Sequence, residues 1–248
     1  MVRTRASSAG RLDPRWPAGA RAGRREPPLR GPGAGMSHDD RIDEATLTVL
    51  MDARQPFAYL ALGPTIELGR RQGLEVNWLP ASVSPLRPPP EIEGNDRSVA
   101  HRRNRSRMIA REIAVYAEAQ GLTLREYYRE GGWSALAQGI LFVREQAPVA
   151  LEAFLQATFA AYWAVELDPE DVGAVAKFVG GHGADAAAFV EWASNDGPAV
   201  ADRIADSLRT RGLSGAPAYL VAGEYFQGRQ HQPMIEWLLE GQEGPGPI

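Results

Sequence analysis

The chain has 248 residues, of which 44% are hydrophobic, and it contains no cysteine. This composition excludes disulfides, thiolate nucleophiles and cysteine-based metal sites within the chain. Residues 1–35 hold eight arginines against Asp13 and Glu26, a net charge of +6; because the whole chain carries −4, residues 36–248 carry −10. An acidic body disfavours nucleic acid as the main partner, since phosphate binding needs a positive surface.

The first residues differ in composition from the rest of the chain. Residues 1–35 are rich in Arg, Pro, Gly and Ala without apolar periodicity, and we predict a disordered basic extension over 1–40. Arg24-Arg25 resembles the start of a twin-arginine export signal, but Glu26-Pro27-Pro28 stands where its apolar segment should begin. An alternative hypothesis takes Met36 as the real start of translation. No run approaches the roughly 20 apolar residues of a membrane-spanning helix, so we expect a cytoplasmic protein without a membrane partner.

The ordered pattern begins with a strand, a helix and a second strand. Residues 46–51 form a short apolar and β-branched run, which predicts a buried strand. Pro56 then opens a helical pattern that continues to about residue 71, and residues 74–79 predict the second strand. Strand, helix and strand over about 35 residues predict a parallel pair joined by a right-handed crossover.

The middle of the chain predicts helices almost throughout. Helical spacing, interrupted by Gly and Pro signals, predicts helices over 98–120, 123–130, 133–146, 148–163, 169–180 and 184–193, and a further helix over 197–211. Trp78, Trp133 and Trp163 are expected either in the core or at the rim of a pocket between domains.

The end of the chain returns to strands. Residues 218–221 and 224–226 flank Ala222-Gly223, which predicts a β-hairpin, and a last helix is expected over 232–240. We therefore predict an α/β thioredoxin-like fold with a large all-helical domain inserted between its βαβ half and its ββα half. The predicted domains are a discontinuous thioredoxin-like domain over 41–96 and 194–242, and an inserted helical domain over 97–193.

Two segments at the ends of the helical block carry a family resemblance. Residues 52–61 read DARQPFAYLA, and residues 212–221 read GLSGAPAYLV. They resemble the D-x-x-S-P-[YF]-x-Y-L and G-[VI]-x-G-[VT]-P motifs of DsbA-like thioredoxin-fold proteins, in the branch of 2-hydroxychromene-2-carboxylate isomerases and kappa-class glutathione transferases. The resemblance covers about residues 46–240. It implies a cis peptide between Ala216 and Pro217, whose main chain would pair with the cysteinyl part of glutathione.

The sequence departs from these motifs at two positions. The catalytic serine of the family, which holds the sulfur of glutathione, is Gln55 here. A glutamine amide can also donate to a sulfur anion, although its donor lies further from the main chain. After the hairpin the family often reads G-x-D-R near the γ-glutamyl end of glutathione, whereas this chain has Gln230 and then His231. The resemblance thus implies glutathione as a cofactor, with Gln55 at the thiol and Ala216, Pro217, Gln230 and His231 around the rest. Both changes favour a different ligand or reduced activity.

The remaining candidates concern the substrate and metals. The resemblance implies a carboxylated substrate, and Phe57, Arg102 and Arg103 are the candidates that would contact it, because arginine binds carboxylates in bidentate fashion. The competing interpretation of the basic run 101–107 is a solvated helix face. The four histidines lack the spacing of zinc ligands, so no metal site is expected.

Two hypotheses for the function follow. The first is a glutathione-dependent isomerase or transferase-like enzyme acting on an aromatic or otherwise apolar carboxylated small molecule. It would have no dithiol redox activity, because the two cysteines that such chemistry needs are absent. The second is a non-catalytic thioredoxin-fold protein that binds a small molecule or a protein partner in the same cleft. A homodimer is left open.

Overall fold

The computed structural model describes residues 39–89 and 97–247. The predicted basic extension lies outside this part of the chain, apart from its last two residues. Both of these have defined contacts: Arg144 Nη2 donates to the Asp39 carbonyl at 2.9 Å, and Asn77 Nδ2 donates to the Asp40 carbonyl at 2.8 Å. These two carbonyls accept hydrogen bonds from the folded body, and the boundary at residue 40 stays a prediction.

The described residues contain one sheet of four strands. The strands are β1 (Leu47–Met51), β2 (Val76–Pro80), β3 (Ala218–Val221) and β4 (Glu224–Gln227), in the spatial order β2-β1-β3-β4. β1 and β2 are parallel, while β3 is antiparallel to both β1 and β4. Every residue of β1 and β2 is buried, as their continuous apolar runs indicate. The pairing of β1 with β3 joins the two ends of the chain and confirms the thioredoxin-like plan.

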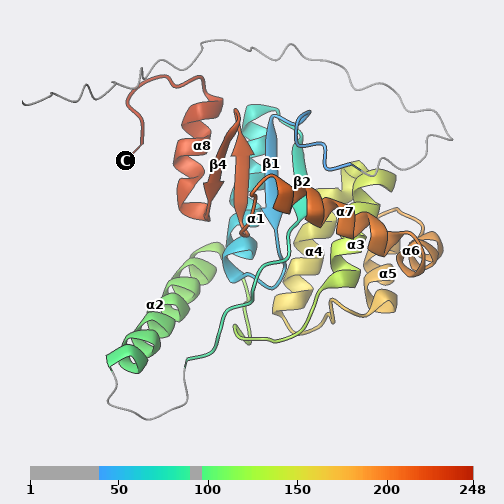
Figure 1. Cartoon of the computed structure of the whole chain (residues 1–248), viewed down its shortest axis with the longest axis horizontal. Helices are drawn as coiled ribbons and strands as arrows, with labels where there is room; N and C mark the ends of the chain where they lie inside the picture. Colours follow the sequence, from blue (N-terminus) through green and yellow to red (C-terminus); the bar gives the residue numbers. More distant parts are fainter. Residues whose placement is uncertain (1–38, 90–96, 248) are drawn as a thin grey trace, which may run out of the picture. The chain divides into compact units, whose positions relative to one another are not determined.

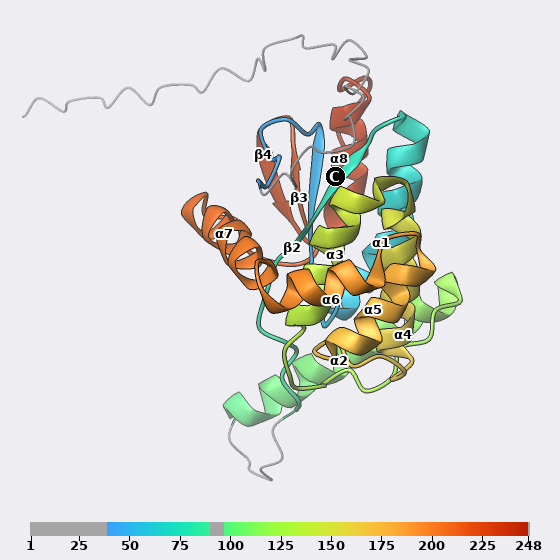
Figure 2. The same cartoon turned by 90° about the vertical axis from the view of Figure 1, so that its right-hand side faces the viewer.

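Helices cover both faces of this sheet. α1 (Pro56–Gln72) and α8 (Gln232–Leu239) lie on one face and α7 (Gly197–Thr210) lies on the other (Figure 2). α1 ends at Gly73, whose left-handed conformation (φ 62°) lets its N–H cap the Arg70 carbonyl. Gln232 Nε2 joins α8 to α1 by donating to Thr65 Oγ1 at 2.8 Å.

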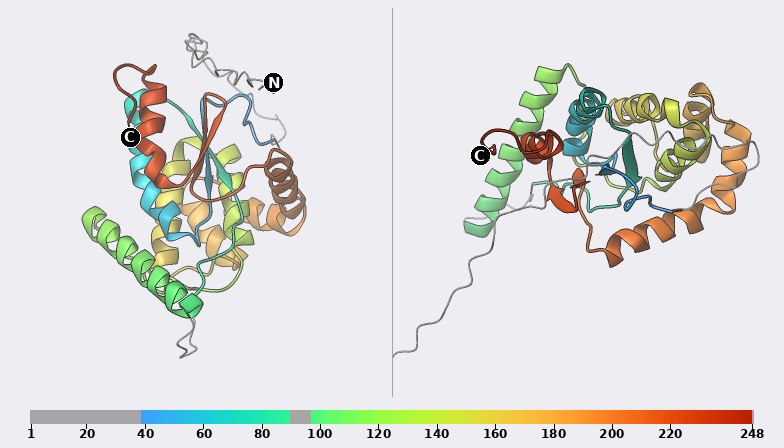
Figure 3. Two further views of the ribbon diagram at one scale, coloured as in Figure 1. Left: turned by 60° about the vertical axis from the view of Figure 1, so that its left-hand side comes forward. Right: turned by 90° about the horizontal axis from the view of Figure 1, so that it is seen from above.

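The helical block stands between β2 and α7, as predicted. It contains α2 (Arg97–Gln120), α3 (Ser134–Gln146), α4 (Leu151–Trp163), α5 (Val172–Gly181) and α6 (Ala186–Ser194), with a 3₁₀ turn at Pro148–Ala150 before α4. α3 packs against α4, α5, α6 and α7. The second half of α2 packs against α1, while its first half extends away from the other helices (Figures 1 and 3). The division of the chain into two domains stays a prediction.

The helix predicted over 123–130 is wrong. The segment is irregular, and Glu126 has φ 52°, which no right-handed helix permits. Its backbone bonds to α4 instead of to itself, because Arg125 N donates to the Trp163 carbonyl at 2.9 Å. The Arg129 guanidinium stacks 4.2 Å from the centroid of the Tyr162 ring. The segment therefore caps the end of α4.

The core lies between the sheet and the helical block. Trp78, Trp133 and Trp163 are at most 2% exposed, which makes them core residues. Arg70 near the end of α1 pairs with Glu152 at the start of α4, so these two helices run antiparallel. Within the described ranges, no helix is long and apolar enough to cross a membrane.

Candidate functional site

The main chain before β3 forms one side of the candidate site. The peptide bond between Ala216 and Pro217 is cis, as the resemblance implied. Leu50 of β1 pairs with Ala218, so Ala216, two residues before that pair, lies toward the end of β1 from which the chain continues to Gln55 and α1. Ala216 is half-buried, and among the described residues its N–H and carbonyl have no main-chain hydrogen bond. A short stretch of backbone is therefore free to pair with a ligand near the start of α1.

Gln55 lies directly before α1 and is only 7% exposed. Its side chain does not cap the helix; Nε2 donates to the Ser84 carbonyl in the loop after β2 at 2.9 Å. Because that carbonyl can only accept, the amide nitrogen must face the loop. The Gln55 side chain, which was expected to contact a ligand sulfur, therefore donates one of its two amide hydrogens to the protein and leaves the other available.

The first turn of α1 leaves one main-chain donor open. Pro56 has no N–H, and the amides of Ala58 and Tyr59 both donate to the Gln55 carbonyl. The N–H of Phe57 has no partner in the described part of the chain. The positive end of the helix dipole therefore presents a single donor, which suits an anion such as a thiolate or a carboxylate.

A buried ion pair fixes the turn before α1. Asp52 is fully buried, and its Oδ2 accepts from Arg54 Nη2 at 2.7 Å and from Val83 N at 2.9 Å. The same guanidinium donates to the carbonyls of Val83 and Gly131, each at 2.9 Å. Both residues belong to the first motif, but no pattern in the sequence indicates that they pair. Their role in the geometry is to hold the turn that carries Gln55.

Arg229 connects the hairpin to α2 and was missed by the sequence interpretation. Its Cζ lies 3.4 Å from the centroid of the Tyr116 ring and 5.9 Å from that of Phe57, and Nη2 donates to Glu112 Oε1 at 3.0 Å. Its buried Nε has no partner among the described residues. Two features of the sequence could have indicated this contact. Arg229 stands next to Gln230, and Glu112 and Tyr116 are four residues apart on α2.

The structure brings some of the predicted residues together and separates others. Gln230 is exposed and donates to the Gln227 carbonyl at 3.1 Å, and the half-buried His231 ring lies 5.6 Å from that of Phe226. Both follow Arg229 in the 3₁₀ turn before α8. Arg102 and Arg103 lie on the first half of α2, about 14–15 Å along the helix from Glu112. Their role as substrate ligands stays a prediction.

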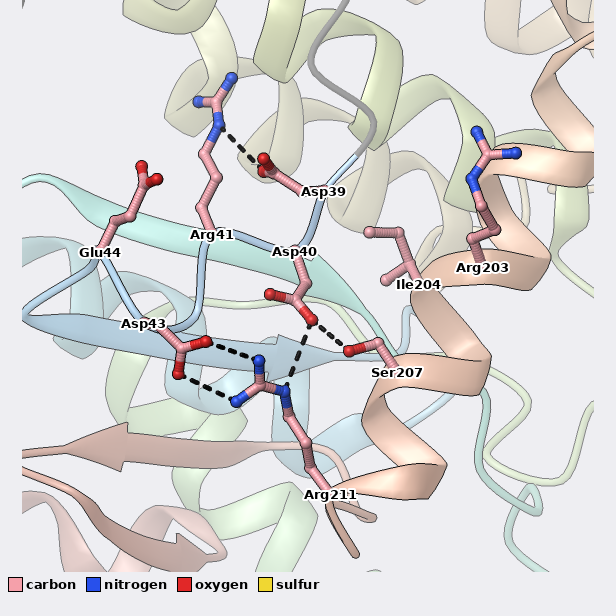
Figure 4. Close-up of a pocket in the computed structure, with 9 residues that line it drawn as sticks. All are labelled: Asp39, Asp40, Arg41, Asp43, Glu44, Arg203, Ile204, Ser207 and Arg211. Carbon is pink, nitrogen blue, oxygen red and sulfur yellow. Dashed lines mark hydrogen bonds and ion pairs between the residues drawn. The ribbon is translucent and has the colours of Figure 1, made fainter.

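A concave region lies on the side of the sheet that α7 covers (Figure 4). This hollow of about 360 Å³ lies between the segment before β1 and the end of α7. Several of its charges are paired: Arg211 forms two hydrogen bonds to Asp43 at 2.7 and 3.0 Å, and Ser207 Oγ donates to Asp40 Oδ2. These contacts join the chain before β1 to α7.

The fold defines a thioredoxin-like protein with a helical insertion, and its candidate site has the Gln55 side chain directly before α1. The chain belongs to the DSBA-like thioredoxin domain family, whose model matches residues 46–240. No curated protein matches the chain.

Two solved structures show the same fold. A 2-hydroxychromene-2-carboxylate isomerase is 19% identical, with a TM-score of 0.61, over 78% of this chain and 94% of that one. The cytosolic disulfide reductase DsbM from Pseudomonas aeruginosa, solved with GSH, is 15% identical, with a TM-score of 0.54, over 79% of this chain and 98% of that one. Likeness at such identities establishes the fold alone.

Proposed function

We propose that the protein binds glutathione in the cleft between Ala216 and the start of α1, and that it acts as an isomerase or transferase-like enzyme on a small apolar carboxylated molecule. Bound glutathione would supply the thiol that the chain itself lacks. The relatives support this choice, since one is a 2-hydroxychromene-2-carboxylate isomerase and another was solved with GSH.

One observation carries the proposal. The N–H and carbonyl of Ala216 are unpaired among the described residues, although β3 begins only two residues later. An extended peptide needs such a donor and acceptor to pair as an additional strand. The cysteinyl residue of glutathione fits this requirement. The open N–H of Phe57 and the remaining amide hydrogen of Gln55 are the donors that would hold its sulfur.

A different observation favours the second candidate function, a binding protein without catalysis. The hydrogen bond from Gln55 to the Ser84 carbonyl fixes the amide in the loop. A side chain held in this way is less free than a serine hydroxyl to follow a sulfur through a reaction. The cleft would then bind a ligand through its backbone and leave it unchanged.

Calorimetric titration separates these functions. The two ligands are reduced glutathione and γ-glutamyl-alanyl-glycine, which keeps the peptide backbone but lacks the sulfur. We expect both to bind, with glutathione the tighter. Gln55→Ala should reduce this preference, while Asp202→Ala, a change at an exposed position of α7, should leave it unaltered. Absence of glutathione binding at millimolar ligand would remove the proposed mechanism.

Activity then separates an enzyme from a binder. We expect wild-type protein to conjugate glutathione to 1-chloro-2,4-dinitrobenzene faster than buffer does, and Gln55→Ser to increase this rate by restoring the hydroxyl of the family motif. If both ligands bind equally and only Gln55→Ser is active, the wild-type protein is the non-catalytic binder.

A further inference from the structure

A second hollow lies on the opposite side of α1 from the sheet, among α1, α4, α5 and the segment after α2. It has a volume of about 450 Å³. We propose that it binds a small, neutral aromatic molecule that carries a single hydrogen-bonding oxygen. None of its lining residues belongs to the cleft beside Ala216, so this site does not depend on glutathione binding there.

Small side chains create the space. The second half of α4 and the residue after it present four alanines to the hollow, and larger apolar groups close its sides; the lining includes Ala157, Ala160, Ala161, Ala164, Leu122 and Phe178. Ala160 is exposed and Ala157 and Ala164 are half-buried, so no side chain of the described residues covers this face of α4 fully. The volume lies within the range of about 300–1,000 Å³ typical of small-molecule pockets.

Tyr59 and Thr123 give this mostly apolar space two hydroxyl groups. Tyr59 is only 6% exposed, and its hydroxyl has no hydrogen-bond partner among the described residues but keeps contact with solvent. Burial raises the pKa of Tyr59, so the phenol stays protonated and able to donate throughout the neutral range. A ligand oxygen would take the place of the water that solvates this hydroxyl.

Charge at the hollow selects the kind of ligand. Glu166 is its one charged lining residue in the described part of the chain, and no basic residue lines it. A carboxylate or phosphate would therefore be repelled, in contrast to the carboxylated substrate proposed for the cleft. The alanine-rich lining, the hydroxyls of Tyr59 and Thr123 and the single acidic group together favour a neutral phenol or ketone of about two fused rings.

The location of binding can be tested with 1-naphthol and protein labelled with ¹³C in its alanine methyl groups. We expect NMR shifts concentrated on Ala157, Ala160, Ala161 and Ala164. Ala160→Leu, which fills the hollow, should weaken binding at least tenfold. Ala153→Leu places the same side chain at an exposed position of α4 outside the hollow and should leave the affinity unchanged.

The role of the hydroxyl is tested with 1-methylnaphthalene, which has the same ring system and no oxygen. Tyr59→Phe should lower the ratio of 1-naphthol affinity to 1-methylnaphthalene affinity by about three- to tenfold, the net effect of one hydrogen bond. An unchanged ratio would overturn the assignment of Tyr59. Shifts outside α4, no shifts at millimolar 1-naphthol, or equal affinities for the two leucine variants would overturn the site itself. The presence or absence of glutathione binding alters none of these outcomes.

Discussion

The buried carboxylate of Asp52 accepts three hydrogen bonds from Arg54: the backbone N–H and Nε donate to Oδ1 at 3.0 Å, and Nη2 donates to Oδ2 at 2.7 Å. Burial is the largest single influence on the pKa of Arg54 and lowers it, but the hydrogen bond and charge of Asp52 outweigh burial and raise it overall. Arg54 therefore stays charged. This one pair ties the turn before α1 to Val83 and Gly131.

Asp52→Asn should be strongly destabilising, because it leaves the Arg54 guanidinium enclosed without a counter-ion. We expect the free energy of unfolding to fall by about 3–5 kcal/mol, as measured by urea denaturation. Asp43→Asn is the matched control, since Asp43 pairs with Arg211 at the surface, where water screens the interaction, and should change stability little. Equal losses in the two variants would contradict the view that the Asp52 pair holds the site turn.

Much of the fold could be predicted because its signals are local. A short apolar run defines β1, and Ala222-Gly223 marks the hairpin of β3 and β4 without reference to the rest of the chain. The prediction of a helix over 123–130 is wrong for the opposite reason. Its helical spacing is local, whereas the carbonyl that its backbone binds belongs to Trp163, far along the chain.

The candidate site was predictable in position but not in orientation. The motif before Pro56 located Gln55, and the second motif located the cis peptide at Pro217. The direction of the Gln55 side chain depends on the Ser84 carbonyl, which only the folded chain places there. Arg229 was missed because its partner Glu112 lies 117 residues away in sequence.

Stability should fall at alkaline pH because of Tyr219. Burial raises the pKa of its phenol to about 12, against 10.0 for the unperturbed group. Below pH 10 the phenol is protonated in both states, so it adds no pH dependence there. Between pH 10 and 12 the unfolded chain loses the proton and the folded chain keeps it, which should lower the free energy of unfolding by about 2–3 kcal/mol.

Tyr219→Phe isolates this contribution from those of other tyrosines. The variant should be less stable at neutral pH, because the Tyr219 hydroxyl interacts with Thr65 and Gln232. Its deficit should shrink or reverse as urea unfolding is followed from pH 9 to 11.5. Parallel pH profiles for the two proteins would show that the phenol does not titrate differently on folding.

Arg229→Met should loosen α2 at the cleft. The substitution keeps most of the side-chain volume but removes the hydrogen bond to Glu112 and the stacking on Tyr116. We expect faster hydrogen exchange in the second half of α2, around Ile113 and Ala117, and no change in α3. Arg229→Lys should rescue protection only in part, since an ammonium lacks the planar group that stacks on the ring. Full protection in the methionine variant would assign the position of α2 to its apolar contacts alone.

Two glycines at the ends of helices should respond to alanine with opposite signs. Gly181, the last residue of α5, is exposed and has open space around the Cβ position, so Gly181→Ala should stabilise the protein by about 0.5–1 kcal/mol through reduced backbone entropy of the unfolded chain. Gly73 caps α1 at φ 62°, where a Cβ is strained, so Gly73→Ala should destabilise the protein by about 1 kcal/mol. Thermal unfolding of both variants under one condition measures the difference. A loss of stability in both variants would mean that backbone conformation does not control the response at these helix ends.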